Sequence, residues 1–433
     1  KQTELARLDN LRALRFRTIF MVSNAASNTQ LLPNGLGDIL PSETTKRRGI
    51  INAIMDSFIR FGYADVSPPL VEYEETLLAE GPGAALADNT FRLMDPVTRR
   101  MLALRSDMTA QIARIASSRL AHHPRPLRLS YTGQVMRINP DPVNPERQLV
   151  QIGAELIGAS TIAHDAEVAV VALESLYRAG IKALSIDLNV PRLLDVILGT
   201  DNADDSGSDH AKDSATESPA IQALRQAVSA KDSKAAGEVD HPQAHVIKTL
   251  LDMPLNPASD IKTMIAGCDK NMPAPARHML NDLADLAGLI SQSAPNVSLT
   301  IDPLERRGFN YHQGIGFSIL APGVRGELGR GGRYRTQSPP QSPPQSQKSQ
   351  PIELSTGVTL YLERVLQAAP ASAPADRLYL HKDQGLDQVV SLTRDGYLII
   401  IGDADPADNA ACQTEAKAMG AKHIYSSNGI ITI

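Results

Sequence analysis

The sequence contains no tryptophan, few aromatic residues and only two cysteines. Aromatic residues make up 4% of the 433 residues, and Cys268 and Cys412 lie far apart without the spacing of a metal site. Two isolated cysteines argue against a disulfide framework or a zinc-stabilised domain, and they are typical of reduced thiols inside a cell. We therefore expect a cytoplasmic protein that holds no metal and no other cofactor.

Two further features are missing: a long apolar run and a surplus of positive charge. The sequence has no stretch of about eighteen apolar residues, and it therefore predicts no membrane span. The formal net charge is -5, with 43 Lys and Arg against 48 Asp and Glu, so the overall charge does not attract a polyanion such as a nucleic acid. The length allows two or three domains around a sizeable core.

The most informative pattern is a pair of expected strands at 127–137 and 148–158. Apolar residues recur near every second position in both strands. The connection between them contains three prolines, which cannot donate to a strand ladder and therefore predict a loop. Arg137 ends the first strand, Asn139 follows it, and the loop carries Asp141 and Glu146. From this stretch alone, an ordinary hairpin remains an open alternative.

Three polar residues stand out in this hairpin and in the segment before it. Asp107 is expected at the start of a helix, where the helix dipole alone would favour an acid. Gln151 and Glu155 share one face of the second strand. Glu155 needs a partner because an unpaired buried charge is costly, and this partner is either a ligand or an arginine such as Arg307.

The remaining pattern predicts the domain organisation. The core is expected in two halves, at 31–200 and 296–370, with a helical insertion at 221–295 between them. Three segments of biased composition are expected to be disordered, namely 1–30, the acidic linker at 201–220 and the Pro/Ser/Gln-rich loop at 336–350. A small α/β domain is expected at 371–433.

These segments, in this order, resemble the class II aminoacyl-tRNA synthetases in their histidyl-tRNA synthetase version. The helix expected at 43–62 and the edge strand around Pro68 are similar to motif 1, which builds a dimer interface, and the hairpin is similar to motif 2. Residues 357–364, which begin at Gly357 and end in Glu363 and Arg364, are similar to motif 3. The resemblance implies an α+β fold, with a synthetase-like antiparallel sheet flanked by helices, a helical insertion and a small C-terminal α/β domain. It also implies a homodimer, for which Ile50, Ile54 and Phe58 would supply the apolar face of the helix.

The resemblance extends to the residues that bind histidine in the synthetases. Residues 104–109, LRSDMT, are similar to the family segment Leu-Arg-Pro-Glu-Gly-Thr, and residues 307–312, RGFNYH, are similar to Arg-Gly-Leu-Asp-Tyr-Tyr. The implied histidine-binding residues are Asp107, Thr109, Gln151, Glu155, Arg307 and Tyr311.

The ATP site departs from the family pattern and is expected to be degenerate. Arg137 and Arg364 match the arginines that hold ATP, but Asn139 stands where the synthetases have a glutamate. Tyr361 replaces the glycine that leaves room for the adenine ring, and an aromatic side chain cannot share that space without moving the backbone. An acidic motif 2 loop would also repel phosphate.

The C-terminal segment is too short and too acidic for a tRNA-binding domain, with eight acids against five bases. A synthetase-like chain of this kind resembles the family of ATP phosphoribosyltransferase regulatory subunits. This second resemblance implies a non-catalytic protein that binds no tRNA. It would assemble with the short-form catalytic subunit into a hetero-octamer and let histidine inhibit the first step of histidine biosynthesis. Two alternatives stay open: a divergent histidine-activating ligase, and a scaffold in which Glu155 and Arg307 merely neutralise each other.

Overall fold

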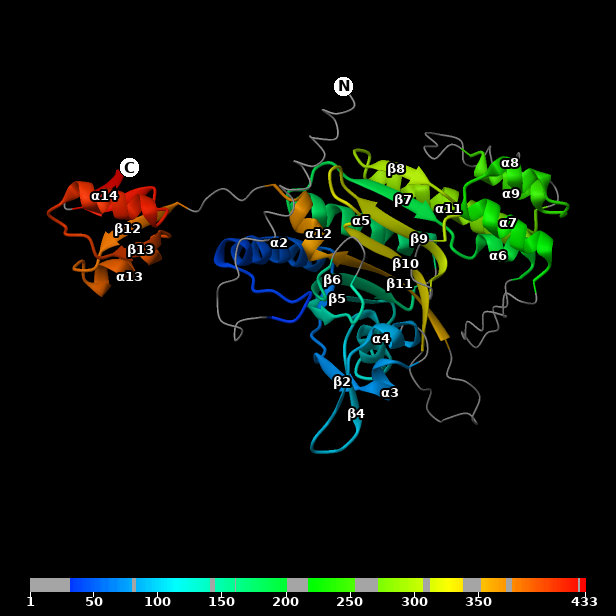
Figure 1. Ribbon diagram of the computed structural model, residues 1–433, viewed down its shortest axis with the longest axis horizontal. Coiled ribbons are helices and arrows are strands. Elements are labelled where there is room, and N and C mark those ends of the chain that lie inside the picture. Colours follow the sequence, from blue (N-terminus) through cyan, green and yellow to red (C-terminus); the bar gives the residue numbers. More distant parts are fainter. Residues whose placement is uncertain are drawn as a thin grey trace, which may run out of the picture. The chain divides into compact units, whose positions relative to one another are not determined.

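The computed structural model describes residues 32–79, 83–140, 145–159, 161–200, 217–253, 272–306, 312–337, 352–370, 376–426 and 429–433. The chain divides into two compact units, Lys1–Ala369 and Pro370–Ile433 (Figure 1). The segment 1–30 and most of the two internal segments expected to be disordered lie outside the described residues. Helix α7 begins at Pro219 and strand β10 ends at Gln337, so regular structure extends slightly into both of those internal segments.

The first unit is built on an eight-stranded mixed sheet with the order β1-β5-β6-β11-β10-β9-β7-β8. The five inner pairings are antiparallel, and only the outer pairs β1–β5 and β7–β8 are parallel. The strands are β1 (Ala64–Asp65), β5 (Leu127–Met136), β6 (Gln148–Ile157), β7 (Ser185–Asn189), β8 (Ser298–Ile301), β9 (His312–Leu320), β10 (Gly329–Gln337) and β11 (Ile352–Tyr361). This architecture confirms the expected α+β fold.

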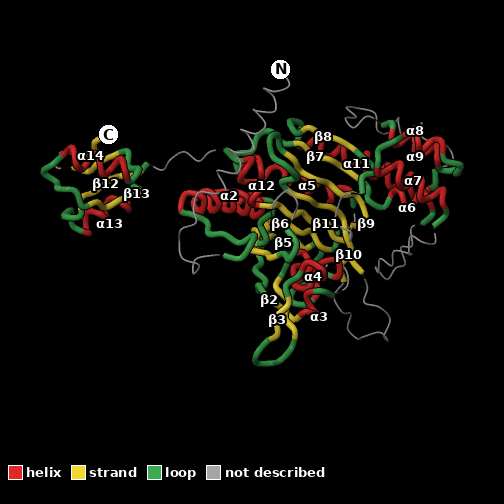
Figure 2. Tube along the Cα trace, viewed as in Figure 1, coloured by secondary structure: helices red, strands yellow, loops and turns green. Residues whose placement is uncertain are grey.

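One face of the sheet carries the main hydrophobic core. The helices α2 (Pro41–Arg60), α5 (Ile162–Arg178) and α12 (Leu362–Ala368) contact β5, β6 and β11, and α11 (Ala274–Ser293) packs on α5 (Figure 2). The core-facing side chains of β6 are Ile152, Ala154 and Leu156, which alternate with Gln151, Gly153 and Glu155 on the other face.

Helix α2 buries its apolar face within its own chain. Ile50, Ile54 and Phe58 are at most 6% exposed and belong to the same core cluster as the residues of α5. The expectation that these three residues provide the apolar face of a dimer interface is therefore wrong. Their 3.6-residue spacing predicts burial, but it does not say whether a neighbouring helix or a second chain covers them.

The opposite face of the sheet is partly covered by α4 (Thr109–Ser117), which contacts β6 and β10. Before it comes a small three-stranded sheet, β2-β4-β3, formed by Val71–Tyr73, Met101–Leu104 and Arg92–Met94. The short helix α3 (Glu74–Leu77) and the 3-10 helix η2 (Ala84–Asn89) lie between these strands in the sequence.

The helical part of the first unit contains α6 (Leu193–Leu198), α7 (Pro219–Ser229), α8 (Ser233–Glu238) and α9 (Ala244–Leu251). Within this part, Arg225 on α7 forms an ion pair of 2.6 Å with Asp195 on α6. Within the described residues, no helix has both the length and the apolar character that crossing a membrane requires.

The second unit is a four-stranded sheet with the order β13-β12-β14-β15. Strand β12 (Arg377–His381) pairs in parallel with β13 (Leu398–Gly402) and β14 (His423–Ser426), and β15 (Gly429–Thr432) returns antiparallel to β14. Helix α13 (Leu386–Arg394) contacts β13, and α14 (Asn409–Ala418) contacts β13 and β14.

Candidate functional site

The polar face of the large sheet brings three candidate residues, Gln151, Glu155 and Tyr361, into one register. Tyr131 on β5 pairs with Gly153 on β6, which pairs in turn with Thr359 on β11. One step along the face, Gln151 pairs with Tyr361, and in the other direction Glu155 pairs with Gly357. Directly paired residues point to the same face of a sheet. Gln151 and Glu155 of the expected histidine site therefore share one surface with Tyr361 of the expected ATP site.

Gln151 forms hydrogen bonds with Asp107 and with the Met108 backbone at the start of α4. Oδ2 of Asp107 accepts a hydrogen bond of 2.7 Å from Nε2 of Gln151, and Oε1 of Gln151 accepts one of 3.0 Å from the Met108 N–H. Oδ1 of Asp107 accepts a bond of 2.8 Å from the Thr109 N–H. Both side chains are nearly fully buried. The contact fixes the beginning of α4 on β6, and it leaves a buried carboxylate beside the polar face.

Glu155 is 1% exposed and lies within a group of hydroxyls. Its Oε1 accepts hydrogen bonds of 3.1 Å from Thr109 and 3.2 Å from Tyr131, and its Oε2 accepts one of 2.7 Å from Tyr334. Burial, together with the nearby Asp107 carboxylate, outweighs these hydrogen bonds and raises the pKa of Glu155 to about 8. The expected partner Arg307 and the candidate Tyr311 both lie outside the described residues.

Three hydroxyl residues of this group are missing from the sequence-based prediction: Tyr131, Tyr334 and Thr359. The Tyr131 hydroxyl lies 3.2 Å from Oγ1 of Thr359 as well as from Glu155. The one available signal in the sequence is the position of Tyr334 directly after Gly331-Gly332-Arg333. A tyrosine in a strand otherwise gives the same apolar signal as any core residue.

Glycines on neighbouring strands make room for these side chains. A Cβ atom at Gly153 would lie 2.3 Å from the Tyr131 ring, and one at Gly357 would lie 1.7 Å from Oε2 of Glu155. Tyr131 and Glu155 therefore lie flat over the glycines of the adjacent strands. The floor of the site depends on these two glycines as much as on the polar residues.

At the other end of the face, Tyr361 lies near the two arginines of the expected ATP site. The guanidinium carbons of Arg137 and Arg364 are 5.9 Å and 5.4 Å from the centre of its ring. Arg364 also donates a hydrogen bond of 3.1 Å to the Glu327 carbonyl and pairs with the Glu327 carboxylate at 3.4 Å. Tyr361 is 9% exposed. The structure thus brings Arg137, Tyr361 and Arg364 together, as expected.

The motif 2 loop joins this arrangement only in part. Asn139 is exposed, and its N–H donates a bond of 2.7 Å to Oδ1 of Asn89. Burial and the neighbouring Glu363 carboxylate raise the pKa of Glu146 above its ordinary value. Asp141 lies outside the described residues. At this end of the loop, burial and the Glu363 carboxylate therefore favour the neutral form of Glu146.

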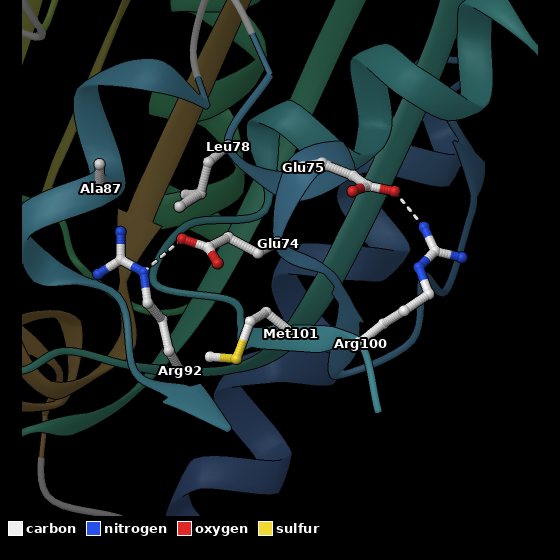
Figure 3. Close-up of a pocket in the computed structure, with 7 residues that line it drawn as sticks. All are labelled: Glu74, Glu75, Leu78, Ala87, Arg92, Arg100 and Met101. Carbon is white, nitrogen blue, oxygen red and sulfur yellow. Dashed lines mark hydrogen bonds and ion pairs between the residues drawn. The ribbon is translucent and has the colours of Figure 1, made fainter. Parts of the chain in front are cut away.

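No group of His, Cys, Asp or Glu residues in the described part of the chain has the geometry to hold a metal ion. A cavity of about 560 Å³ lies beside the small sheet β2-β4-β3, apart from the polar face (Figure 3). Its charged lining consists of two ion pairs, Glu74 with Arg92 at 2.6 Å and Glu75 with Arg100, around Leu78, Ala87 and Met101.

The chain is similar to known proteins over most of its length. The sequence model of the histidyl-tRNA synthetase family matches residues 35–365. Relatives from Rhodospirillum centenum and Gluconobacter oxydans, both named ATP phosphoribosyltransferase regulatory subunit, are 36% identical to the chain. The alignments span 92% of the chain and 95% of the first relative, and 91% and 95% for the second.

Solved structures show the same fold at lower identity. A regulatory subunit/histidyl-tRNA synthetase from Bacillus halodurans superposes with a TM-score of 0.69 at 19% identity, covering 91% of this chain and 97% of that one. A histidyl-tRNA synthetase from a Nostoc species gives a TM-score of 0.67 at 15% identity, covering 92% of both chains.

Proposed function

Because the chain belongs to the family of ATP phosphoribosyltransferase regulatory subunits, within the histidyl-tRNA synthetase fold, we propose that it binds histidine and passes feedback inhibition to a catalytic partner. The names of its relatives support a role in histidine biosynthesis. In this proposal the reaction itself belongs wholly to the partner, the short-form catalytic subunit, and the two kinds of chain form a hetero-octamer.

The observation that carries the proposal is the retention of two buried carboxyl groups, Asp107 and Glu155, on one polar face. Buried carboxyl groups without a cationic partner weaken a fold, so their presence calls for a ligand. Histidine supplies what the face requires, with an ammonium group for Asp107 and an imidazole for Glu155. Arg307 would bind the carboxylate of histidine, a role that rests on the sequence alone.

The residues of the expected ATP site support a non-catalytic role. An enzyme that activates histidine needs space for adenine, and the Tyr361 ring lies beside both arginines that would hold the nucleotide. A divergent ligase is the second candidate, and it would require this ring to move. No contact among the described residues favours such a movement.

Self-association is supported by the distribution of exposed apolar side chains. Three lie in the rest of the described first unit, namely Tyr177, Leu289 and Ile352. Between residues 32 and 101 there are ten: Leu32, Ile39, Leu40, Ile59, Phe61, Leu70, Leu93, Met94, Val97 and Met101. Exposed apolar side chains that adjoin one another on a surface mark protein interfaces. We infer a homodimer through this part of the chain, in which the exposed residues replace Ile50, Ile54 and Phe58 as the contact.

The test combines assembly with inhibition. The chain is co-purified with the short-form catalytic subunit, and phosphoribosyl transfer is measured against histidine for the wild type and Glu155→Gln. We expect normal assembly and a histidine potency at least about fivefold weaker, the lower end of usual allosteric couplings. Glu415→Gln is the matched control, because Glu415 also accepts a tyrosine hydroxyl, that of Tyr379, in the other unit. Unchanged potency in an assembled Glu155→Gln complex would mean that the pocket is structural.

A further inference from the structure

The carboxyl group of Glu155 has one free acceptor position. Two carboxyl oxygens offer about four lone-pair sites. Thr109 and Tyr131 use the two on Oε1, and Tyr334 uses one on Oε2. The remaining site on Oε2 can hold either the proton of the carboxylic acid or an N–H group of a ligand, but it cannot hold both.

Among the described residues, the groups around Glu155 give no positive charge to balance a carboxylate. The donors from β5, β10 and α4 are the neutral hydroxyls of Tyr131, Tyr334 and Thr109, and β11 contributes Gly357. Asp107, before α4, adds a negative charge, and Glu155 forms no ion pair within the described part of the chain. Burial raises the pKa of Tyr131 well above its ordinary value, so Tyr131 remains a donor. The empty site therefore favours the neutral acid.

Resting on the histidine site proposed above, we propose that Glu155 supplies the proton that a bound imidazole ring takes up. The O–H bond on Oε2 breaks and an N–H bond forms on the ring nitrogen, which leaves a carboxylate paired with an imidazolium. The imidazolium N–H then occupies the position that the acid proton held. The number of protons in the complex equals the number brought by a neutral ring and a neutral acid, so binding exchanges no proton with solvent.

This transfer fixes how binding varies with pH. Above pH 8, where the pKa of Glu155 lies, the empty site has lost its proton, and binding must take one from solvent. Affinity then falls by up to about tenfold per pH unit. Below about pH 6.5, the usual pKa of the ring, the ligand brings an extra proton that must be released, and affinity falls again. Affinity is therefore highest between these limits.

The experiment is calorimetric titration of histidine into the full-length chain, alone and in complex with the catalytic subunit, from pH 6 to 9. Two buffers with different ionisation enthalpies give the number of protons exchanged. We expect close to zero protons at pH 7 and uptake rising toward one proton at pH 9. The ammonium group of free histidine also deprotonates in alkaline solution, so the wild type is compared at each pH with Glu155→Gln, which shares that effect.

The ratio of wild-type to Glu155→Gln dissociation constants is expected to be constant up to about pH 8 and to rise up to about tenfold by pH 9. Tyr334→Phe removes a donor to the carboxylate, which raises the pKa of Glu155 further and moves the alkaline loss to higher pH. The Tyr379 hydroxyl bonds to Glu415 in the other unit, and the control variant Tyr379→Phe is expected to match the wild type.

If histidine binds with a constant ratio of the two dissociation constants from pH 7 to 9, this inference is overturned and the proposed function stands. If histidine binds to neither the chain nor the complex at any pH, both are overturned.

Discussion

The Tyr334 hydroxyl on β10 donates a hydrogen bond of 2.7 Å to Glu155 on β6, across the strand β11 that lies between them. The contact is possible because Gly357 on β11, the direct partner of Glu155, has no side chain. Glu155, Tyr334 and Gly357, from three neighbouring strands, therefore form one structural unit. This unit lies on the polar face, while the residues that alternate with it hold the core.

Gly357→Ala is expected to disrupt this unit. The added Cβ would lie 1.7 Å from Oε2 of Glu155, so the glutamate must move off the strand or β11 must shift. Overpacking of this kind costs about 1–3 kcal/mol of unfolding free energy. Chemical denaturation measures the loss, and histidine binding should weaken with it because the carboxyl group leaves its hydroxyl partners.

Gly288→Ala is the matched control for that variant. Gly288 lies within α11 with open space around its missing Cβ, so alanine there should stabilise by about 0.5–1 kcal/mol. Equal effects at the two positions would contradict the close contact between Gly357 and Glu155.

The stability of the first unit is expected to fall as pH rises from 5 to 8. Burial raises the pKa of Glu155 from 4.5 to about 8, so in this range the folded chain holds a proton that the unfolded chain has lost. The stabilisation by this proton is complete below pH 4.5 and is lost above about pH 8. Between these values the unfolding free energy falls by up to about 1.4 kcal/mol per pH unit. Glu155→Gln has no such proton, so the difference in unfolding free energy between the two proteins isolates this slope. Parallel stability curves for the two proteins would contradict the prediction.

The sequence predicts the large elements well and the site only in part. Approximate alternation and three prolines locate the hairpin to within a residue, because a strand with one buried face has a period of two. The same reasoning places Gln151 and Glu155 on one face. It does not reveal Tyr334, because that contact depends on strand order and register across β11, which local pattern does not encode. Helix α2 shows a similar limit, since periodicity identifies its apolar face but not what covers it.

Tyr361 is expected to be what keeps ATP out of the site. The wild type should show no histidine-dependent exchange of pyrophosphate into ATP, because the ring lies beside Arg137 and Arg364 where the nucleotide would bind. Tyr361→Gly should bind ATP more tightly than the wild type does, while losing about 3–5 kcal/mol of stability through the lost aromatic packing. Tyr361→Phe keeps the ring and serves as the control. Exchange by the wild type at the rates of a synthetase would refute the regulatory assignment.

Leu70→Lys is expected to convert a dimer into a monomer. Leu70 is 45% exposed and precedes β2, within the part of the first unit where exposed apolar side chains concentrate. A lysine there leaves the folded monomer intact, because the side chain is already in solvent, but it buries an unpaired charge when two chains associate. Light scattering at micromolar concentration measures the change, and circular dichroism verifies the fold.

Leu289→Lys on α11 is the control for this last variant, because Leu289 is also an exposed leucine, at 36%, but lies outside that part of the chain. It should leave the mass unchanged. If both lysine variants dissociate the dimer, a nonspecific charge effect explains the result. If the wild type is monomeric both alone and with the catalytic subunit, the exposed residues between 32 and 101 must contact a different partner, and the homodimer is excluded.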